Sequence, residues 1–335
     1  MKNRVFFLWV VLATMIAASF GGEGARTAHA ETTLLVYTAI EPEWLPKYKK
    51  AFEEANPDIR IKWLREGTGT ITARILAEKE NPRADVIFGL ATSSLLVFKA
   101  QGMLESYTPR DFDKIYPAMR DSSDEPCWVG LHAYGTGFCV NRPEMEKRGL
   151  SAPKSWEDLI RPEYKGLIVM PDPAASGSGY MNLAAWMQMW GEEKAWAYMD
   201  ALYANLKMLA PSGARPAAMA AQGEVPIGLS TRAFAEPFLK RRAPLDVIMP
   251  DKAGWEMESC AIVRGTQNLE AARRLMDFGC SEAVAKIGAS FAAIPTRTEF
   301  VTDKTSFERL APMDHQWGAD NRERLLDAWR VRYGN

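Results

Sequence analysis

Residues 84–94 read ADVIFGLATSS, and this stretch decides the fold class. Residues 86–90 are nearly all apolar, a pattern typical of a strand that is covered on both faces of a sheet. Thr92, Ser93 and Ser94 follow at once, and hydroxyl side chains favour the N-terminus of a helix. The stretch therefore predicts a buried strand that runs directly into a helix.

The same order of elements recurs towards the N-terminus. Residues 33–37 predict an apolar strand, and residues 43–56 have the spacing of an amphipathic helix. Residues 59–63 alternate between apolar and charged side chains as a half-buried strand does, the GTGT run at 67–70 breaks that strand, and helical spacing returns over 71–80. Strands that alternate with helices favour a parallel, doubly wound sheet and an α/β fold.

A second α/β unit is predicted beyond Pro126. Residues 167–170 read as a strand, a loop rich in Gly and Ser follows, and residues 180–190 form a strongly apolar helix. Further strands are predicted at 225–229, 245–249 and 260–263. The two units would be joined through residues 128–140 and, on the return, through residues 254–263. Both crossings contain glycine, which a hinge tolerates.

The N-terminus has the features of a secretory signal peptide. Lys2 and Arg4 precede an apolar run over residues 5–20, and a stretch of small residues ends at Ala30. We therefore expect residues 1–30 to be a leader that is cleaved near Ala30. No cysteine follows the apolar run as a lipid anchor would require, since the first is Cys127, so the mature chain is predicted to be free in the periplasm.

Composition and motifs narrow the class of function. The formal net charge of −1 gives no basic excess for nucleic acid. The sequence contains no G-x-S-x-G, H-E-x-x-H or G-x-G-x-x-G motif, so we predict neither an enzyme nor a cofactor; a secreted hydrolase is a remote alternative. An interaction protein would need repeats or exposed apolar patches, and the sequence shows neither.

Cysteine and histidine do not indicate a metal site. Cys127, Cys139, Cys260 and Cys280 form no C-x-x-C pair, and His132 and His315 are the only histidines after the leader. In an oxidising compartment one structural disulfide is one interpretation, and buried free thiols are the other.

Small polar residues lie at the carboxyl ends of predicted strands and at the starts of the helices that follow. Open α/β sheets bind ligands at this edge, where backbone N–H groups and helix N-termini favour anions. Any one such loop is better explained as an ordinary helix cap and turn, but their number favours a binding site. The predicted ligand-binding residues of this kind are Thr38, Ala39, Thr68, Gly69, Thr92, Ser93, Ser176, Ser178, Gly179, Ser212, Ser230 and Thr231.

Several motifs resemble the extracellular solute-binding proteins of ABC importers, a family that includes ferric-ion binders. They are VYTA at 36–39, FEEANP at 52–57, ADVIF at 84–88 and SWEDL at 155–159. The resemblance covers nearly the whole mature chain. It implies the two-lobed α/β periplasmic binding protein type II fold, with a ligand cleft between lobes that close on binding.

The same resemblance implies limits for the lobes. Residues 31–130 plus 262–335 would form lobe 1, and residues 131–261 would form lobe 2. The protein would act as a monomer that delivers its solute to an inner-membrane permease.

Within the family, three segments resemble the branch that binds 2-aminoethylphosphonate: GTITA at 69–73, MPDPAASG at 170–177 and WAYMDAL at 196–202. The resemblance implies reversible capture of this zwitterion. Ferric binders carry adjacent tyrosines on the loop that matches residues 229–234, and this chain has no tyrosine there, so iron is the least favoured ligand. The branch usually has bulkier, partly aromatic residues at Thr231 and Arg232, which leaves the exact ligand open.

An ammonium group needs a carboxylate or an aromatic face. Glu41 is the first candidate and Glu258 the second, with Tyr134 and Trp255 as possible walls of the pocket. Arg215 and Arg232 are candidate partners for the phosphonate. The alternative ligands are a phosphorylated sugar or glycerate and a thiamine-like or polyamine cation. An acidic, aromatic cleft would favour the cation, and a cleft of Ser, Thr and Gly would favour the anion.

Overall fold

Parallel strands followed by helices build the first part of the protein, as the sequence predicts. The computed structural model describes residues 31–300 and 309–334, so the predicted leader lies outside the described residues. β1 pairs in parallel with both β2 and β3. The elements are β1 (Thr32–Thr38), α1 (Leu45–Ala55), β2 (Ile59–Arg65), α2 (Thr68–Ala77), β3 (Val86–Ala91), α3 (Thr92–Ala100) and β4 (Leu104–Glu105).

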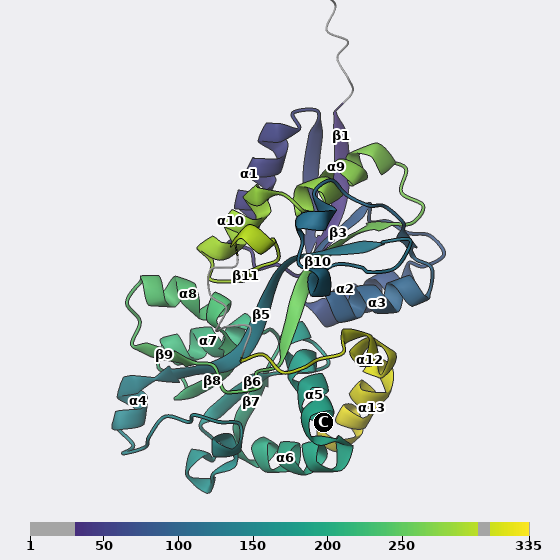
Figure 1. Ribbon diagram of the computed structural model, residues 1–335. Helices are drawn as coiled ribbons and strands as arrows, with labels where there is room; N and C mark the ends of the chain where they lie inside the picture. The colour runs from purple at the N-terminus through teal and green to yellow at the C-terminus, as the bar shows by residue number, and fades with distance from the viewer. Residues whose placement is uncertain (1–30, 301–308, 335) are drawn as a thin grey trace, which may run out of the picture. The chain divides into compact units, whose positions relative to one another are not determined.

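Two long strands cross from this part to the rest of the protein (Figure 1). They are β5 (Trp128–Asn141) and β10 (Trp255–Val263), the two crossings that the sequence predicts. The N-terminal part of β5 pairs with β10, whereas residues 136–141 pair with β8 (Ile227–Thr231) and β9 (Leu245–Ile248). β5 therefore belongs to both parts of the sheet.

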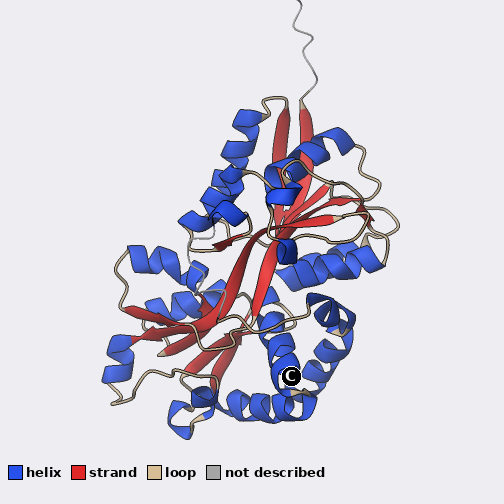
Figure 2. Ribbon diagram, in the orientation of Figure 1, coloured by secondary structure: helices blue, strands red, loops and turns tan. Residues whose placement is uncertain are grey.

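The second part repeats the alternation of strand and helix. β6 pairs in parallel with β7 and β8, and helices lie around the strands (Figure 2). The sheet order is β2-β1-β3-β10-β5-β8-β6-β7. The remaining elements are α4 (Arg142–Glu146), β6 (Ile168–Pro171), α5 (Gly177–Trp190), α6 (Glu192–Asn205), β7 (Leu206–Ala210), α7 (Ala214–Ala221), α8 (Arg232–Lys240), α9 (Leu269–Gly279), α10 (Glu282–Ser290), β11 (Ile294–Pro295), α12 (His315–Asp320) and α13 (Arg322–Tyr333).

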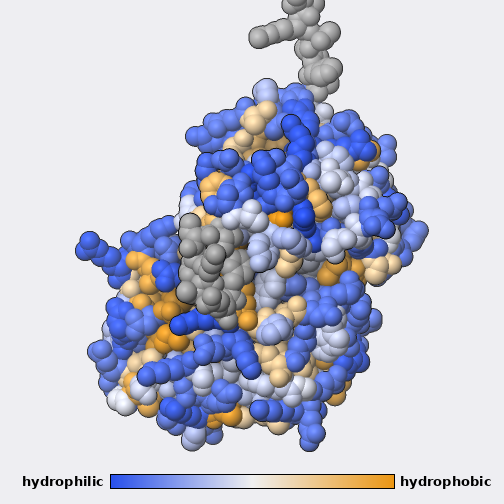
Figure 3. Space-filling view, in the orientation of Figure 1, coloured by the Kyte–Doolittle hydropathy of each residue, from blue (hydrophilic) through white to orange (hydrophobic). Residues whose placement is uncertain are grey.

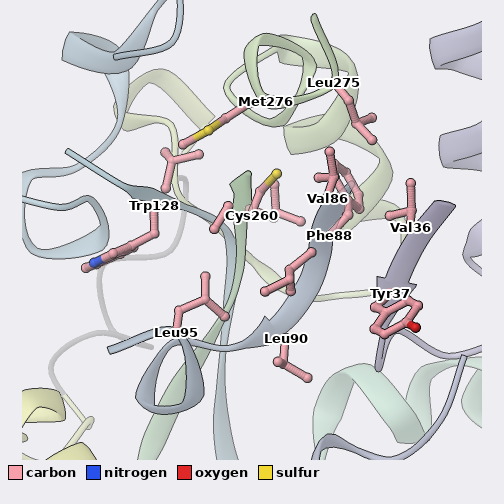
Figure 4. Close-up of a cluster of buried hydrophobic side chains, with 14 of the residues drawn as sticks. Val36, Tyr37, Val86, Phe88, Leu90, Leu95, Trp128, Cys260, Leu275 and Met276 are labelled. Atoms are coloured by element: carbon pink, nitrogen blue, oxygen red, sulfur yellow. The ribbon is translucent and has the colours of Figure 1, made fainter. Parts of the chain in front are cut away.

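The hydrophobic core is divided between the two parts, which gives the two-lobed α/β arrangement. A first core forms around β1, β3 and β10, and Figure 4 shows Phe88, Leu95 and Cys260 within it. A second core forms around β6 and α5, with Trp186 at its centre. A smaller cluster lies around α7, with residues from β5, β6, β7, α8 and β9. Burial of these large side chains supplies the main stabilisation of each lobe.

The lobe limits given above stay a prediction, and one packing observation bears on them. Leu325, Leu326 and Trp329 of α13 pack in the second core, although they fall in the range predicted for lobe 1. Ala319 of α12 packs in the first core, whereas Trp317 of the same helix packs against the second. These contacts place α12 against both cores and α13 in the second.

The surface of the described residues carries few large apolar side chains. Only Tyr116, Met208 and Val331 among them are large hydrophobic residues with exposed side chains, and the face in Figure 3 is mainly hydrophilic with small apolar groups. No helix within residues 31–300 and 309–334 is long and apolar enough to cross a membrane.

Candidate functional site

The first turn of α2 contacts the loop that precedes α5, so elements of the two lobes meet here. The Gly69 N–H donates a hydrogen bond to the Ala175 carbonyl at 3.3 Å. A Cβ atom on Gly69 would lie 2.3 Å from the Ala174 carbonyl oxygen, and one on Gly177 would lie 2.8 Å from the Thr68 hydroxyl. Because real Cβ contacts are not this short, glycine is required at both positions for the lobes to touch.

Four residues at the N-termini of α5 and α7 and the end of β8 form what we term the serine cluster: Ser176, Ser178, Gly213 and Ser230. The Ser176 and Ser178 hydroxyl oxygens are 3.1 Å apart, and the Ser230 hydroxyl donates to the Gly213 carbonyl at 2.6 Å. A Cβ atom on Gly213 would lie 2.1 Å from the Ser178 oxygen, which places the two residues in contact. Hydroxyl donors beside two helix N-termini suit an anion.

Two other predicted residues lie beside this cluster. A Cβ atom on Gly179 would lie 2.6 Å from the Asp172 carbonyl oxygen, so this glycine lets α5 pack against its own entry loop. Ser212 is half-buried in the bend before α7. A ligand-binding role for either residue stays a prediction.

Two adjacent hydroxyl groups at the N-terminus of α3 have different surroundings, although the sequence predicts the same role for both. The Thr92 hydroxyl bonds to the Ser259 hydroxyl and lies 3.4 Å from the Met257 carbonyl, so it holds α3 on β10. The Ser93 hydroxyl is buried and has no hydrogen-bond partner in the described structure, while its N–H donates to a Glu256 carboxylate oxygen at 3.4 Å. Ser93 therefore retains the capacity to bind a ligand, and Thr92 has a structural partner.

A small cavity brings together both candidate carboxylates. Its volume is about 10 Å³, room for about one water molecule at most. We term it the carboxylate cavity. It is lined by Ala39, Ile40, Glu41, Trp44, His132, Tyr134, Thr231, Ala233, Phe234 and Glu258. The β1–α1 loop, β5, β8, α8 and β10 all contribute.

Hydrogen bonds fix the loop on one side of this cavity. The Thr38 hydroxyl accepts the Ile40 N–H at 3.1 Å, and the Ala39 N–H donates to the Gly89 carbonyl at 2.8 Å. On the other side, Thr231 caps α8 by accepting the Phe234 N–H at 3.3 Å. Each of these two walls is therefore fixed by hydrogen bonds within its own side of the cavity.

Comparison with known proteins fits this arrangement of facing helix N-termini between two lobes. A family model described as bacterial extracellular solute-binding protein matches residues 81–315. The chain belongs to this family.

Individual proteins similar to this chain are also solute-binding proteins. The chain is similar to the periplasmic binding protein AfuA from Actinobacillus pleuropneumoniae, solved with bound fructose-6-phosphate, at 30% identity over 90% of this chain and 98% of that one, with a TM-score of 0.84. It is 28% identical to a probable ABC transporter periplasmic-binding protein of Sinorhizobium fredii, over 88% of this chain and 81% of the relative. It is 26% identical to the spermidine/putrescine-binding periplasmic protein of Escherichia coli K12, over 84% and 83%.

These relatives are solute-binding proteins and not enzymes. The chain is accordingly a periplasmic solute-binding component of ABC transport, with a small solute and a membrane permease as its partners. The resemblance found in the sequence is thus confirmed at the level of family and fold, while the 2-aminoethylphosphonate branch stays a prediction.

The two carboxylates of this solute-binding protein have different partners. Glu41 forms an ion pair with Arg65, with 2.8 Å between oxygen and nitrogen. Burial raises the pKa of Glu41, and the Arg65 charge opposes that rise. Glu258 has one carboxylate oxygen that is buried without a hydrogen-bond partner in the described structure. Burial, followed by the charges of Glu256 and Glu41, raises the pKa of Glu258 to about 8, with Arg65 opposing.

A pH-dependent stability follows from Glu258. Its folded pKa exceeds the ordinary value of 4.5, so the folded state holds a proton that the unfolded state has lost, and stability falls as pH rises towards 8. Burial lowers the pKa of His132 to about 3, which makes stability rise with pH up to about 6.5. Between pH 6.5 and 8 only the Glu258 effect remains of these two.

We expect the free energy of unfolding of the solute-free protein to fall by up to about 1.4 kcal/mol per pH unit between pH 6.5 and 8. The variant Glu258→Gln should lose that slope. Urea titrations at several pH values measure both. An equal slope in the two proteins would show that Glu258 is already ionised at pH 6.5.

The sequence did not reveal a polar cluster behind α3 that comprises Glu256, His315, Arg322 and Tyr180. The His315 Nδ1 atom is 3.6 Å from a Glu256 oxygen. Arg322 is only 6% exposed, its guanidinium lies 4.3 Å from the centre of the Tyr180 ring, and its Nη1 atom has no hydrogen-bond partner in the described structure. The Tyr180 hydroxyl donates to the Gly318 carbonyl. The one feature of the sequence that could have indicated this cluster was the presence of two acidic residues, Glu256 and Glu258, within the apolar strand β10.

The aromatic and arginine residues that the sequence suggested as further solute contacts do not lie together. Tyr134 lines the carboxylate cavity, whereas the Trp255 indole donates to the Ala311 carbonyl at 3.0 Å and is not among the lining residues. Arg215 pairs with Glu224 at the surface. Arg232 lies 3.5 Å from Glu236 and is likewise exposed.

All four cysteines are buried and free, so the interpretation as free thiols holds in this structure and the disulfide does not form. Within residues 31–300 and 309–334 no group of three or more His, Cys, Asp or Glu side chains is placed to hold a metal ion.

Proposed function

We propose that this protein captures a small organophosphorus solute that carries an ammonium group, with 2-aminoethylphosphonate favoured, and delivers it to its ABC permease. One observation carries the proposal: the serine cluster and the carboxylate cavity are adjacent. Ser230 bonds to Gly213 in the serine cluster, and the next residue, Thr231, lines the cavity. Phe234 also lines the cavity, and a Cβ atom on Gly213 would lie 2.9 Å from its ring.

This adjacency matches the two ends of a zwitterion. In the proposal the phosphonate binds the hydroxyl and N–H donors of Ser176 and Ser178, with Ser93 from the facing lobe, and Ser230 holds Gly213 in place beside them. The ammonium binds between Glu41 and Glu258. Charge-assisted hydrogen bonds at both ends would set the specificity, because a solute that lacks either charge leaves buried groups without partners. Capture is reversible and no covalent bond changes.

A phosphorylated sugar is the second candidate, favoured by the similarity to AfuA with fructose-6-phosphate. Its phosphate would use the same serine cluster, and its hydroxyl groups would donate to the carboxylates. A polyamine would use the carboxylate cavity alone, and the relative named for spermidine and putrescine gives reason to test it.

Isothermal titration calorimetry of the mature protein, refolded to remove carried-over solute, tests the proposal. We expect 2-aminoethylphosphonate to bind at least about 100-fold more tightly than ethylphosphonate or ethanolamine, because each lacks one charged group, at about 3 kcal/mol or more per group left unpaired in a buried site. Phosphate, fructose-6-phosphate, putrescine and ferric citrate complete the panel. Tighter binding of fructose-6-phosphate or of putrescine would replace the favoured ligand with that one.

A pair of serine variants locates the anion end. Ser178→Ala removes a hydroxyl from the serine cluster and should weaken binding about tenfold, the usual effect of losing one hydrogen bond to a charged group. Ser290→Ala removes an exposed hydroxyl on α10 that bonds to Lys47, and it should leave affinity unchanged. Equal affinities for Ser178→Ala and the wild type would remove the serine cluster from the proposed site.

A further inference from the structure

The carboxylate cavity holds an unequal pair of carboxylates. Glu41 is bonded to Arg65 at 2.8 Å, so its negative charge is compensated. Glu258 is 8% exposed, and its Oε2 atom is fully buried without a hydrogen-bond donor in the described structure. An ionised carboxylate in that position would be buried and uncompensated, which is strongly unfavourable.

The described titratable groups that face Glu258 supply no free positive charge to pair with it. These groups are Glu41 from the β1–α1 loop, Tyr48 from α1, Arg65 from β2, His132 and Tyr134 from β5, and Glu256 from β10 itself. Arg65 is the one permanent cation among them, and it is bonded to Glu41. His132 lies opposite Glu258 on β5, and burial lowers its pKa to about 3, so it is neutral at pH 7.

The walls of the cavity suit a cation. Trp44, Tyr134 and Phe234 line it, and aromatic faces attract an ammonium group that has lost its water. With a volume of about 10 Å³ the cavity admits one small polar group. The rest of a solute would extend past Thr231 towards Ser230.

We propose that the carboxylate cavity is a cation-exchange subsite, in which the ammonium group of the solute replaces a proton held by Glu258 in the free protein. This inference rests on the proposed function for the presence of an ammonium group. The neutral carboxyl of Glu258 gives its proton to the solvent, and the resulting carboxylate pairs with the entering ammonium. The net charge of the cavity is unchanged, and each solute captured releases up to one proton.

The subsite would select between classes of solute. A solute with an ammonium group displaces the proton, so its affinity rises with pH until Glu258 is ionised in the free protein. A solute with a hydroxyl group at the same place leaves the carboxyl protonated and releases no proton from Glu258. The number of protons released therefore identifies the chemical group that occupies the cavity.

The test is calorimetry with 2-aminoethylphosphonate at pH 7 in MOPS, imidazole and Tris, buffers whose ionisation enthalpies differ. We expect the wild type to release between about 0.5 and 1 proton more per solute than Glu258→Gln does. The comparison between the two proteins removes any proton that comes from the phosphonate. Circular dichroism shows whether the variant is folded. An equal proton count in the two proteins would overturn the proposal.

A second measurement needs no solute and separates this inference from the proposed function. The infrared band of a protonated carboxyl should be present in the free wild-type protein at pH 7 and absent from Glu258→Gln. Its absence from the wild type would overturn the inference whatever the solute is. If the band is present but 2-aminoethylphosphonate gives no heat, the choice of ligand is wrong. The calorimetric measurement of released protons is then repeated with putrescine.

Discussion

Replacement of Gly69 by Ala is expected to weaken solute binding by about ten- to hundredfold while both lobes stay folded. The added methyl group would lie 2.3 Å from the Ala174 carbonyl oxygen. Overpacking of this kind costs about 1–3 kcal/mol, and here the clash is with backbone, which cannot rotate away. Because the contact joins elements of the two lobes, the cost applies only to the arrangement in which they touch.

The same substitution does not harm the helix that carries it. Gly69 is the second residue of α2 and is not among the glycines with positive φ. Alanine in a helix is favoured over glycine by about 1 kcal/mol. The free energy of unfolding should therefore be unchanged or slightly higher, while the equilibrium between open and closed forms shifts towards open.

Calorimetry and small-angle X-ray scattering with and without solute measure the two effects. We expect the wild type to contract on binding and Gly69→Ala to contract only at much higher solute concentration. Gly318→Ala is the matched control, because a Cβ atom there would lie 4.0 Å from its nearest neighbour, Ala184 Cβ. Wild-type affinity in Gly69→Ala would mean that the solute-bound protein does not use this contact.

The fold could be predicted from the sequence because its signals are local. The apolar run at 86–90 and the hydroxyl residues after it give β3 and the start of α3, as expected. The prediction was wrong at 67–70, where the GTGT run was expected to precede the helix but α2 begins at Thr68. The Thr72 hydroxyl bonds to the Thr68 carbonyl within this turn, and Gly69 is required by a contact with the other lobe. That contact is not encoded in the local pattern.

The site was less predictable because it depends on contacts between distant segments. The sequence indicated Glu41 and Glu258 separately, but not that they line one cavity or that Arg65 pairs with only one of them. It also could not distinguish Thr92, which is bonded to β10, from Ser93, whose hydroxyl has no partner in the described structure. Side-chain type selects candidates, and only tertiary packing decides which hydroxyl groups remain available.

The second large effect is expected at the polar cluster behind α3. Glu256→Gln should lower the free energy of unfolding by about 1–3 kcal/mol, because it removes the carboxylate charge that interacts with the buried Arg322 guanidinium and that accepts the Met257 and Ser93 N–H groups. Burial lowers the pKa of Arg322, and the charges of Tyr180 and then Glu256 oppose that shift. Glu256 is not within ion-pair distance of Arg322, whose Nη1 atom has no hydrogen-bond partner in the described structure, so the two charges interact at longer range.

The double variant Glu256→Gln with Arg322→Met separates charge from packing. Since it removes both charges, it should recover at least about 1 kcal/mol relative to the sum of the single variants, a coupling that denaturant titrations resolve. Additive effects would show that the two charges do not stabilise each other. The coupling also has a functional consequence, because Glu256 accepts the Ser93 N–H and the Arg322 guanidinium lies over Tyr180 in the first turn of α5. The cluster thus contacts both the N-terminus of α3 and the first turn of α5, and its loss should weaken solute binding as well as folding.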